Sequence, residues 1–181
     1  PLYIACIKGR ADIVRLLLAS GNGVRRGGKV GKSFLHEMCE LNHVQVVTML
    51  LDNGADVNAA CEHGQSLLLL ACSKGFLELT QLLLSKGADV SKAEGEGKSP
   101  LLMAGINDHL GVIQLLLSKG VDVNRADMKA LFLLMMACAR NRVAEVQLLL
   151  AKGPDIRQTS LRQQQQLPLL IACFNGHTSV A

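Results

Sequence analysis

Apolar triplets recur along the chain at one fixed interval. Five of them are spaced by 33 residues: 16–18, 49–51, 82–84, 115–117 and 148–150. A second series has the same spacing: Pro1, Phe34, Leu67, Pro100 and Leu133, with Pro168 following 35 residues later. Two series that agree over five copies indicate an internal repeat of 33 residues.

Each repeat has the pattern of two short helices followed by a loop. In residues 97–124, Ser99 is a helix-capping hydroxyl and Pro100 suits the first position of a helix. We expect helices over 101–106 and 110–119, with Gly120 ending the second and 121–124 extended. Helices this short are unstable alone, so neighbouring units must bury one another.

Several segments carry a family resemblance. The turn segment 31–36 reads GKSFLH, Asn42-His43 precedes Val46-Val47, 54–58 reads GADVN, 87–90 reads GADV, and Gly176-His177 follows near the end. This pattern resembles the ankyrin repeat. The resemblance implies an all-α ankyrin-repeat solenoid of stacked helix-turn-helix units with β-hairpin-like loops.

We expect one domain over residues 1–181. It divides into a partial unit 1–27, repeats 28–60, 61–93, 94–126 and 127–161, and a partial unit 162–181. Neither end shows the polar outer face of a terminal repeat. We therefore expect a monomeric fragment of a longer chain, with further repeats or another domain on both sides.

Composition narrows the classes of partner. The chain is 49% hydrophobic but only 3% aromatic, and its net charge is +4. Few aromatic side chains and a modest positive charge disfavour nucleic-acid binding. No apolar run reaches the length of a membrane span, so we expect no membrane partner.

The six cysteines follow the repeat. Cys6, Cys39, Cys72 and Cys138 occupy one slot of the 33-residue repeat, and Cys173 falls there after a two-residue insertion; Cys61 is the exception. A small side chain that recurs at a packing slot is expected to be buried. Reduced, unpaired thiols are typical of the cytoplasm or nucleus.

Two other patterns, a possible zinc site and a possible phosphate-binding loop, are also explained by the repeat. His36, Cys39 and His43 have a spacing that could suit zinc, but no fourth ligand is spaced nearby. Gly-Lys-Ser triplets at 31–33 and 97–99 lack the earlier glycine of a phosphate loop, since Arg26 and Lys92 stand there. We therefore expect no cofactor, no metal and no enzymatic activity.

The resemblance implies protein binding by hairpin tips and by a concave surface of first helices. The hairpin tips supply Lys29, Lys32, His63, Gln65, Glu96, Lys98, Met128, Lys129 and Leu131. The first helices supply Lys8, Glu40, Leu41, Ser73, Lys74, Ile106, Asn107, Arg140 and Phe174. Basic residues outnumber acidic ones at these positions, which favours an acidic protein or peptide partner with apolar anchors. The alternative is that they are ordinary solvated surface charges.

The repeat 127–161 departs most from the pattern. Ala130 replaces the turn glycine, Phe132 the capping hydroxyl, and Leu133 the proline, while Glu145 stands at a Val or Ile slot. Either this finger is an apolar anchor, or the repeat is degenerate. Separately, Asn58 and Asn124 end Val-Asn loops that resemble ankyrin asparagines hydroxylated by an asparaginyl hydroxylase.

The sequence thus predicts a non-catalytic protein-binding module or scaffold in the cytoplasm or nucleus. The alternative is a regulatory or substrate-recruiting ankyrin segment of a larger enzyme or channel. No motif in the sequence identifies the partner protein.

Overall fold

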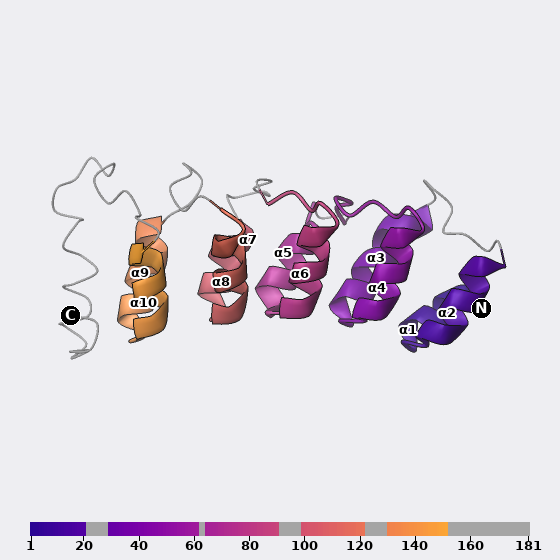
Figure 1. Ribbon diagram of the computed structural model, residues 1–181, viewed down its shortest axis with the longest axis horizontal. Coiled ribbons are helices and arrows are strands. Elements are labelled where there is room, and N and C mark those ends of the chain that lie inside the picture. Colours follow the sequence, from indigo (N-terminus) through magenta and orange to yellow (C-terminus); the bar gives the residue numbers. More distant parts are fainter. Residues whose placement is uncertain (21–28, 62–63, 91–98, 122–129, 152–181) are drawn as a thin grey trace.

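A computed structural model of the chain describes residues 1–20, 29–61, 64–90, 99–121 and 130–151. Helices follow one another in pairs within this part of the chain (Figure 1). The pairs are α1 Leu2–Ile7 with α2 Ala11–Ala19, α3 Lys29–Glu40 with α4 Val44–Asp52, α5 Leu67–Lys74 with α6 Leu77–Ser85, α7 Pro100–Ile106 with α8 Leu110–Ser118, and α9 Ala130–Ala139 with α10 Val143–Ala151.

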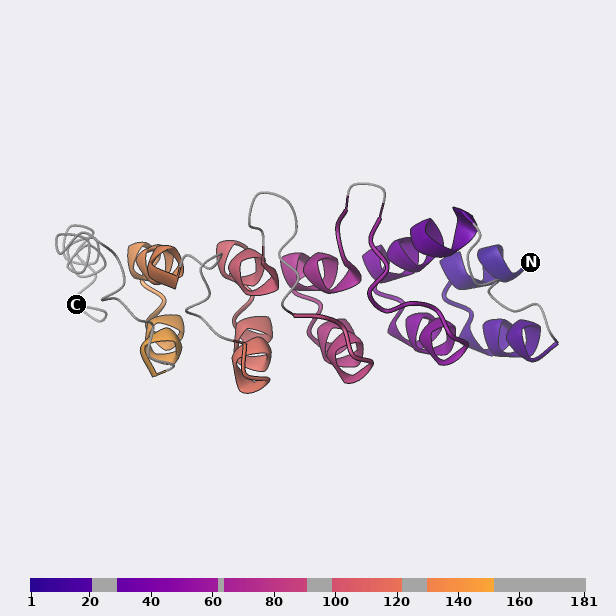
Figure 2. The same ribbon diagram turned by 90° about the horizontal axis from the view of Figure 1, so that it is seen from above.

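The pairs stack side by side into an elongated array of two layers. Seen from above, the odd-numbered helices form one row and the even-numbered helices the other (Figure 2). Each pair falls within one of the units expected from the sequence. An all-α solenoid is therefore confirmed, and in the described residues its loops contribute one isolated antiparallel bridge, between Ala60 and Ser66.

Two odd-numbered helices begin where the sequence places a capping serine. The Ser66 hydroxyl accepts a hydrogen bond from the Leu69 amide, and the Ser99 hydroxyl accepts one from Leu102, each at 3.2 Å. Pro100 then occupies the first turn of α7, where its missing N–H costs nothing. The observed bounds of α7 and α8 lie within one residue of the predicted ones.

The turn inside every pair contains one residue in the left-handed region. These residues share a slot and have φ between 55° and 73°: Gly9, Asn42, Gly75, Asp108 and Asn141. Glycine, asparagine and aspartate are the residues that tolerate this conformation best. The slot thus accounts for the sharp reversal from each odd-numbered helix to its even-numbered partner.

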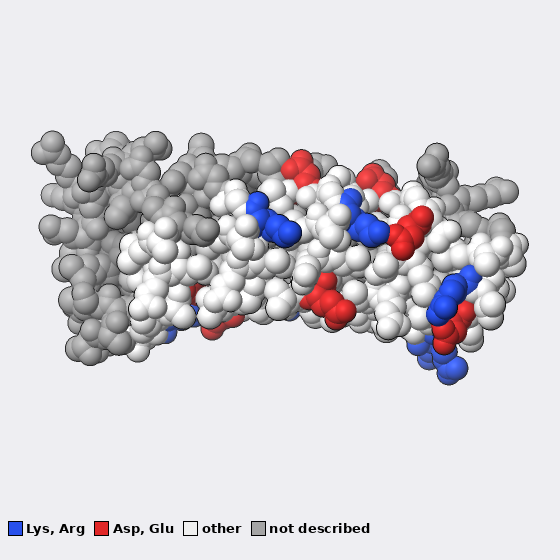
Figure 3. Space-filling model, in the orientation of Figure 1, with Lys and Arg blue, Asp and Glu red and all other residues white. Residues whose placement is uncertain are grey.

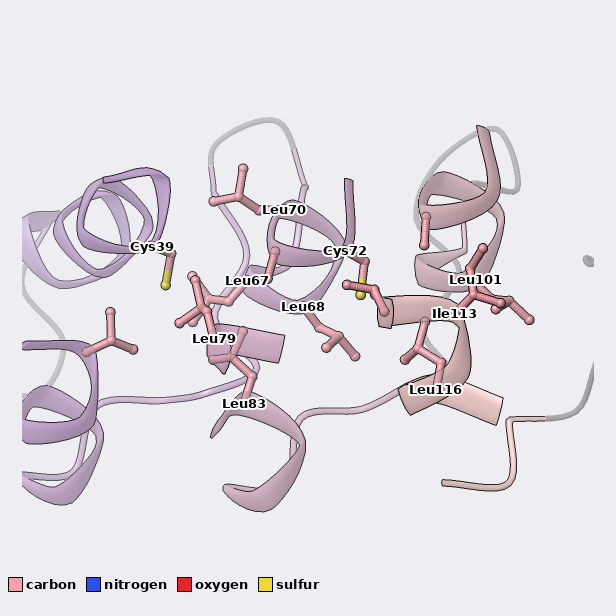
Figure 4. Close-up of a cluster of buried hydrophobic side chains, with 14 of the residues drawn as sticks. Cys39, Leu67, Leu68, Leu70, Cys72, Leu79, Leu83, Leu101, Ile113 and Leu116 are labelled. Atoms are coloured by element: carbon pink, nitrogen blue, oxygen red, sulfur yellow. The ribbon is translucent and has the colours of Figure 1, made fainter. Parts of the chain in front are cut away.

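The core lies between the layers and between neighbouring pairs (Figure 4). At one slot of the even-numbered helices, Val46, Leu79 and Val112 are no more than 1% exposed. Ile13 has the same slot in the first pair, where no described pair precedes it, and is 45% exposed. Stacking therefore buries this slot, as expected for helices too short to persist alone.

Two helices begin earlier than the sequence predicts. Helix α3 starts at Lys29 and α9 at Ala130, so Lys29, Lys32 and Leu131 are helical, and the prediction that they form hairpin tips is wrong. Both helices have a helix-compatible residue, Phe34 or Leu133, at the slot of Pro100. Proline disfavours helical backbone in the residue before it, so its absence permits an upstream extension. Helix α5 also lacks proline there but begins at Leu67, after its capping Ser66.

The even-numbered layer presents few charged side chains (Figure 3). Helix α8 contains no charged residue, and the acid of α10, Glu145, is buried. Arg15 pairs with Asp12 at 2.7 Å, and Lys86 pairs with Asp52 across neighbouring units. In the described residues, no helix has both the length and the apolar character needed to cross a lipid bilayer.

Candidate functional site

Eight of the predicted partner-binding residues form one row along the array. They lie at the C-terminal ends of the odd-numbered helices and in the turns that follow, and we call this row the turn edge: Lys8, Glu40, Leu41, Ser73, Lys74, Ile106, Asn107 and Arg140. Ser73 and Ile106 are half-buried and the other six are exposed, including Leu41 at 46%. The row thus offers cations, one acid and apolar side chains on a single edge.

Some of these side chains are held by local hydrogen bonds. The Ser73 hydroxyl donates to the Leu70 carbonyl at 2.9 Å, and the Asn107 amide donates to the Met103 carbonyl at 3.0 Å. By contrast, Lys8 and Lys74 form no ion pair with any other described residue. These two ammonium groups are therefore available to bind an acidic group of a partner.

Histidines join neighbouring units beside the turn edge. His43 Nε2 lies 3.0 Å from the Ile7 carbonyl, and His109 Nε2 lies 3.1 Å from the Ser73 carbonyl. In both cases the acceptor is at the end of the preceding odd-numbered helix, where carbonyls lack helical partners. Phe76 occupies the same slot between these histidines and has no such donor.

The last described joint uses arginines instead of histidine. Arg142, at the histidine slot, donates from Nη1 to the Gly105 carbonyl at 3.2 Å, and Arg140 donates to the Ile106 carbonyl at 2.8 Å. Arg142 Nη2 also forms an ion pair with Asp108 at 2.6 Å, and its Nη1 lies 3.2 Å from a Glu145 carboxylate oxygen. Arg140 of the turn edge is thus held in place and remains exposed.

A second row of candidate contacts lies on the odd-numbered helices themselves. Ile4 is 64% exposed, and Glu37, Met103 and Met136 at the same slot are half-buried, whereas Leu70 at this slot is buried and interrupts the row. Tyr3 is 49% exposed, and its hydroxyl donates to the Glu37 carboxylate at 3.1 and 3.2 Å. This hydrogen bond is the main reason that the pKa of Tyr3 is raised. The positions chosen from sequence missed this row, although the 33-residue spacing could have located it.

The cysteines in the described residues behave as core side chains. Cys6, Cys39, Cys72 and Cys138 are buried, which confirms the packing prediction for these four, and Cys61 is half-buried. Burial raises the pKa of Cys6 to about 11 and those of Cys39 and Cys72 to about 12. These thiols are protonated near neutral pH and therefore poor nucleophiles.

The histidines of the possible zinc triplet do not converge. His36 Nε2 lies 2.7 Å from the Gln65 carbonyl in the next unit, whereas His43 faces the Ile7 carbonyl of the preceding unit. No group of three His, Cys, Asp or Glu side chains in the described residues is arranged to hold a metal ion. Each of these histidines thus lies against a backbone carbonyl of a neighbouring unit.

The remaining predicted contacts are placed differently. Gln65 is half-buried and lies before α5, at the opposite end of its unit from the turn edge. The backbone of Lys29, Lys32 and Leu131 is helical, as described above. Six predicted contacts lie outside the described residues: His63, Glu96, Lys98, Met128, Lys129 and Phe174.

Comparison with known families agrees with the repeat architecture. A family model described as ankyrin repeats (3 copies) matches residues 1–61 and 58–127, and one described as ankyrin repeats (many copies) matches residues 134–181. A search of curated proteins gave no significant match. Since the family models match nearly every residue, the chain belongs to the ankyrin-repeat family.

Proposed function

We propose that this chain is a non-catalytic scaffold that binds a partner protein or peptide. Ankyrin repeats are generally protein–protein interaction modules. The observation that carries the proposal is the turn edge, whose exposed residues recur in register over successive units. A peptide laid along this edge and the odd-numbered helices would contact several units at once, as solenoid surfaces allow.

The charge of the turn edge favours an acidic partner. Lys8, Lys74 and Arg140 are exposed there, and Glu40 is the single acid of the row. On the even-numbered layer, in contrast, Arg15 and Lys86 are paired with acids of the same chain. Leu41 and Ile106 would supply the apolar contacts that a charged row lacks.

We also propose that the protein works in the cytoplasm or the nucleus. Four thiols are buried without a disulfide partner in the described residues, and burial raises their pKa. Proteins of oxidising compartments more often use cysteines in pairs. Fractionation of cells with detection of the endogenous chain tests this; recovery in a secreted fraction would contradict it.

The binding proposal is tested by charge reversal on opposite layers. Partners are captured with the 181-residue chain, identified, and their affinity is measured by calorimetry at two salt concentrations. We expect Lys74→Glu to weaken binding about tenfold, and added salt to weaken the unsubstituted complex. The matched control is Lys119→Glu, since Lys119 is an exposed cation on the even-numbered side. Equal losses in both variants, or no loss in either, would exclude the turn edge.

A further inference from the structure

Two unusual residues of the last described unit are partners of one another. Arg142 stands at the slot of His43 and His109, and Glu145 stands at the slot of Val46 and Val112. The two side chains are 3.2 Å apart, with Arg142 Nη1 facing Glu145 Oε2. The pairing gives Glu145 a structural role, which the hypothesis of a degenerate repeat does not supply.

The pair lies inside the joint between α7–α8 and α9–α10. Glu145 is 2% exposed, and the Arg142 side chain is 14% exposed. On the facing unit, a methyl group at Gly105 would lie 3.7 Å from Glu145 Oε1 and would overlap Leu133. The carboxyl group therefore occupies the apolar interface that Val46 and Val112 fill with hydrocarbon at other joints.

Among the described residues, few charges surround this carboxyl group. Arg142 and Arg140 face it from the turn between α9 and α10, and Asp108 faces it from the turn between α7 and α8. Helices α7, α8 and α9 contain no charged residue. The facing histidine of this region, His109, is directed to the Ser73 carbonyl of the other neighbour.

Arg142 is shared between two acids. Its Nη2 is closer to Asp108, at 2.6 Å, than its Nη1 is to Glu145, at 3.2 Å. Burial is the largest influence on Glu145 and outweighs the arginine, so its pKa is raised. An ionised Glu145 is thus held in the joint at a free-energy cost that its attraction to Arg142 offsets only in part.

We propose that this joint is a proton-sensitive latch, which tightens when Glu145 takes up a proton and loosens when Glu145 is ionised. The proton comes from solvent and converts the carboxylate into a neutral carboxylic acid. Arg142 keeps its charge and its ion pair with Asp108. The latch controls how readily α9–α10 separates from the rest of the array, a property distinct from partner recognition at the turn edge.

The direction of the pH effect follows from proton linkage. Because its folded pKa is raised, Glu145 binds a proton more tightly when the joint is closed than when it is open. Its stabilising contribution is therefore complete below the ordinary glutamate pKa and is lost as the pH rises through the folded value. One linked proton changes the opening equilibrium by at most about tenfold per pH unit.

Amide hydrogen exchange resolved by segment tests the latch in the 181-residue chain. Protection factors, corrected for the intrinsic pH dependence of exchange, are compared for α9–α10 and α5–α6 between pH 7.5 and pH 5. We expect the protection of α9–α10 relative to α5–α6 to rise on acidification, by no more than about tenfold per pH unit. Helix pair α5–α6 is the internal control, because its corresponding slot holds Leu79.

Two variants keep the proposal falsifiable if one of them folds poorly. Glu145→Gln retains the shape of the side chain, and Glu145→Val reproduces the residue of Val46 and Val112. We expect both to abolish the pH response, and Asp108→Asn to reduce it without abolishing it, because burial is a larger cause of the raised pKa of Glu145 than Asp108 is. A wild-type ratio that does not change with pH, or a response that survives in Glu145→Gln, would overturn the latch.

Discussion

The imidazole of His109 lies directly over the backbone of Gly75 in the preceding unit. A methyl group built on Gly75 would come within 2.4 Å of His109 Nδ1, while His109 Nε2 reaches the Ser73 carbonyl at 3.1 Å. Gly9 and His43 repeat the arrangement two joints earlier in a looser form, with a closest approach of 3.1 Å. The left-handed residue of one unit thus determines which side chain the next unit can place over it.

The Gly75–His109 contact predicts an unequal effect of two glycine substitutions. Gly75→Ala adds left-handed strain and displaces the imidazole from its acceptor, so we expect a loss of about 2–3 kcal/mol in unfolding free energy. Gly87→Ala is the matched control: its φ is 85° but nothing lies within 4 Å, so strain alone should cost about 1 kcal/mol. Urea denaturation followed by circular dichroism measures both. Similar losses would show that the contact with His109 contributes nothing.

The joint between α3–α4 and α5–α6, where Phe76 occupies the histidine slot, predicts a coupling between Asn42 and Phe76. Phe76→His would supply the missing donor to the preceding helix end, but the Cβ atom of Asn42 stands where the two joints with a histidine have glycine. We expect Phe76→His alone to destabilise the chain, since apolar packing is lost. Adding Asn42→Gly should recover about 1 kcal/mol more than the sum of the single effects. A double-mutant cycle that is additive would contradict this.

Burial predicts a selective pattern of cysteine alkylation. The pKa values of Cys39 and Cys72 are about 12, so their thiolate fraction at pH 8 is very small, and both side chains are buried. Cys61 is half-buried and should react with iodoacetamide much sooner, by about tenfold or more. Peptide mass spectrometry over a time course compares these residues directly. Equal rates under native conditions would mean that the packing slot is open.

The hydrogen bonds of Asn58 indicate that its side chain links two neighbouring loops. Its side-chain oxygen accepts a hydrogen bond from the Asp89 amide at 2.8 Å, and its nitrogen lies 3.4 Å from the Gly87 carbonyl. Asn58→Ala should cost about 1 kcal/mol and increase hydrogen exchange at Asp89. Asn53→Ala is the control, because Asn53 donates only within its own helix, to the Met49 carbonyl. Unchanged hydrogen exchange at the Asp89 amide in Asn58→Ala would contradict this prediction.

Features that follow the 33-residue spacing were predictable from the sequence, and features that depend on neighbours were not. The spacing located the helix pairs, the cysteine slot and the serine cap of α7. The early start of α9 at Ala130 was not predicted, because the unusual residues there suggested either an apolar anchor or a degenerate repeat and not a longer helix. Glu145 appeared anomalous at its own slot, since only the stacked units bring Arg142 and Asp108 around it. For the candidate site, the sequence located the turn edge. It did not show which of the charged side chains there form hydrogen bonds within the chain.

The hydrogen bonds beside the turn edge give the array a direction. At each described joint that has one, the donor belongs to the later unit and the acceptor to the earlier: His43 to Ile7, His109 to Ser73, and Arg140 to Ile106. A ribosome makes the chain from its N-terminus, so every one of these acceptors is synthesised before its donor. Along the turn edge, each new helix pair therefore meets acceptors that are already in place as it emerges, and growth and folding of this edge can proceed in the same order.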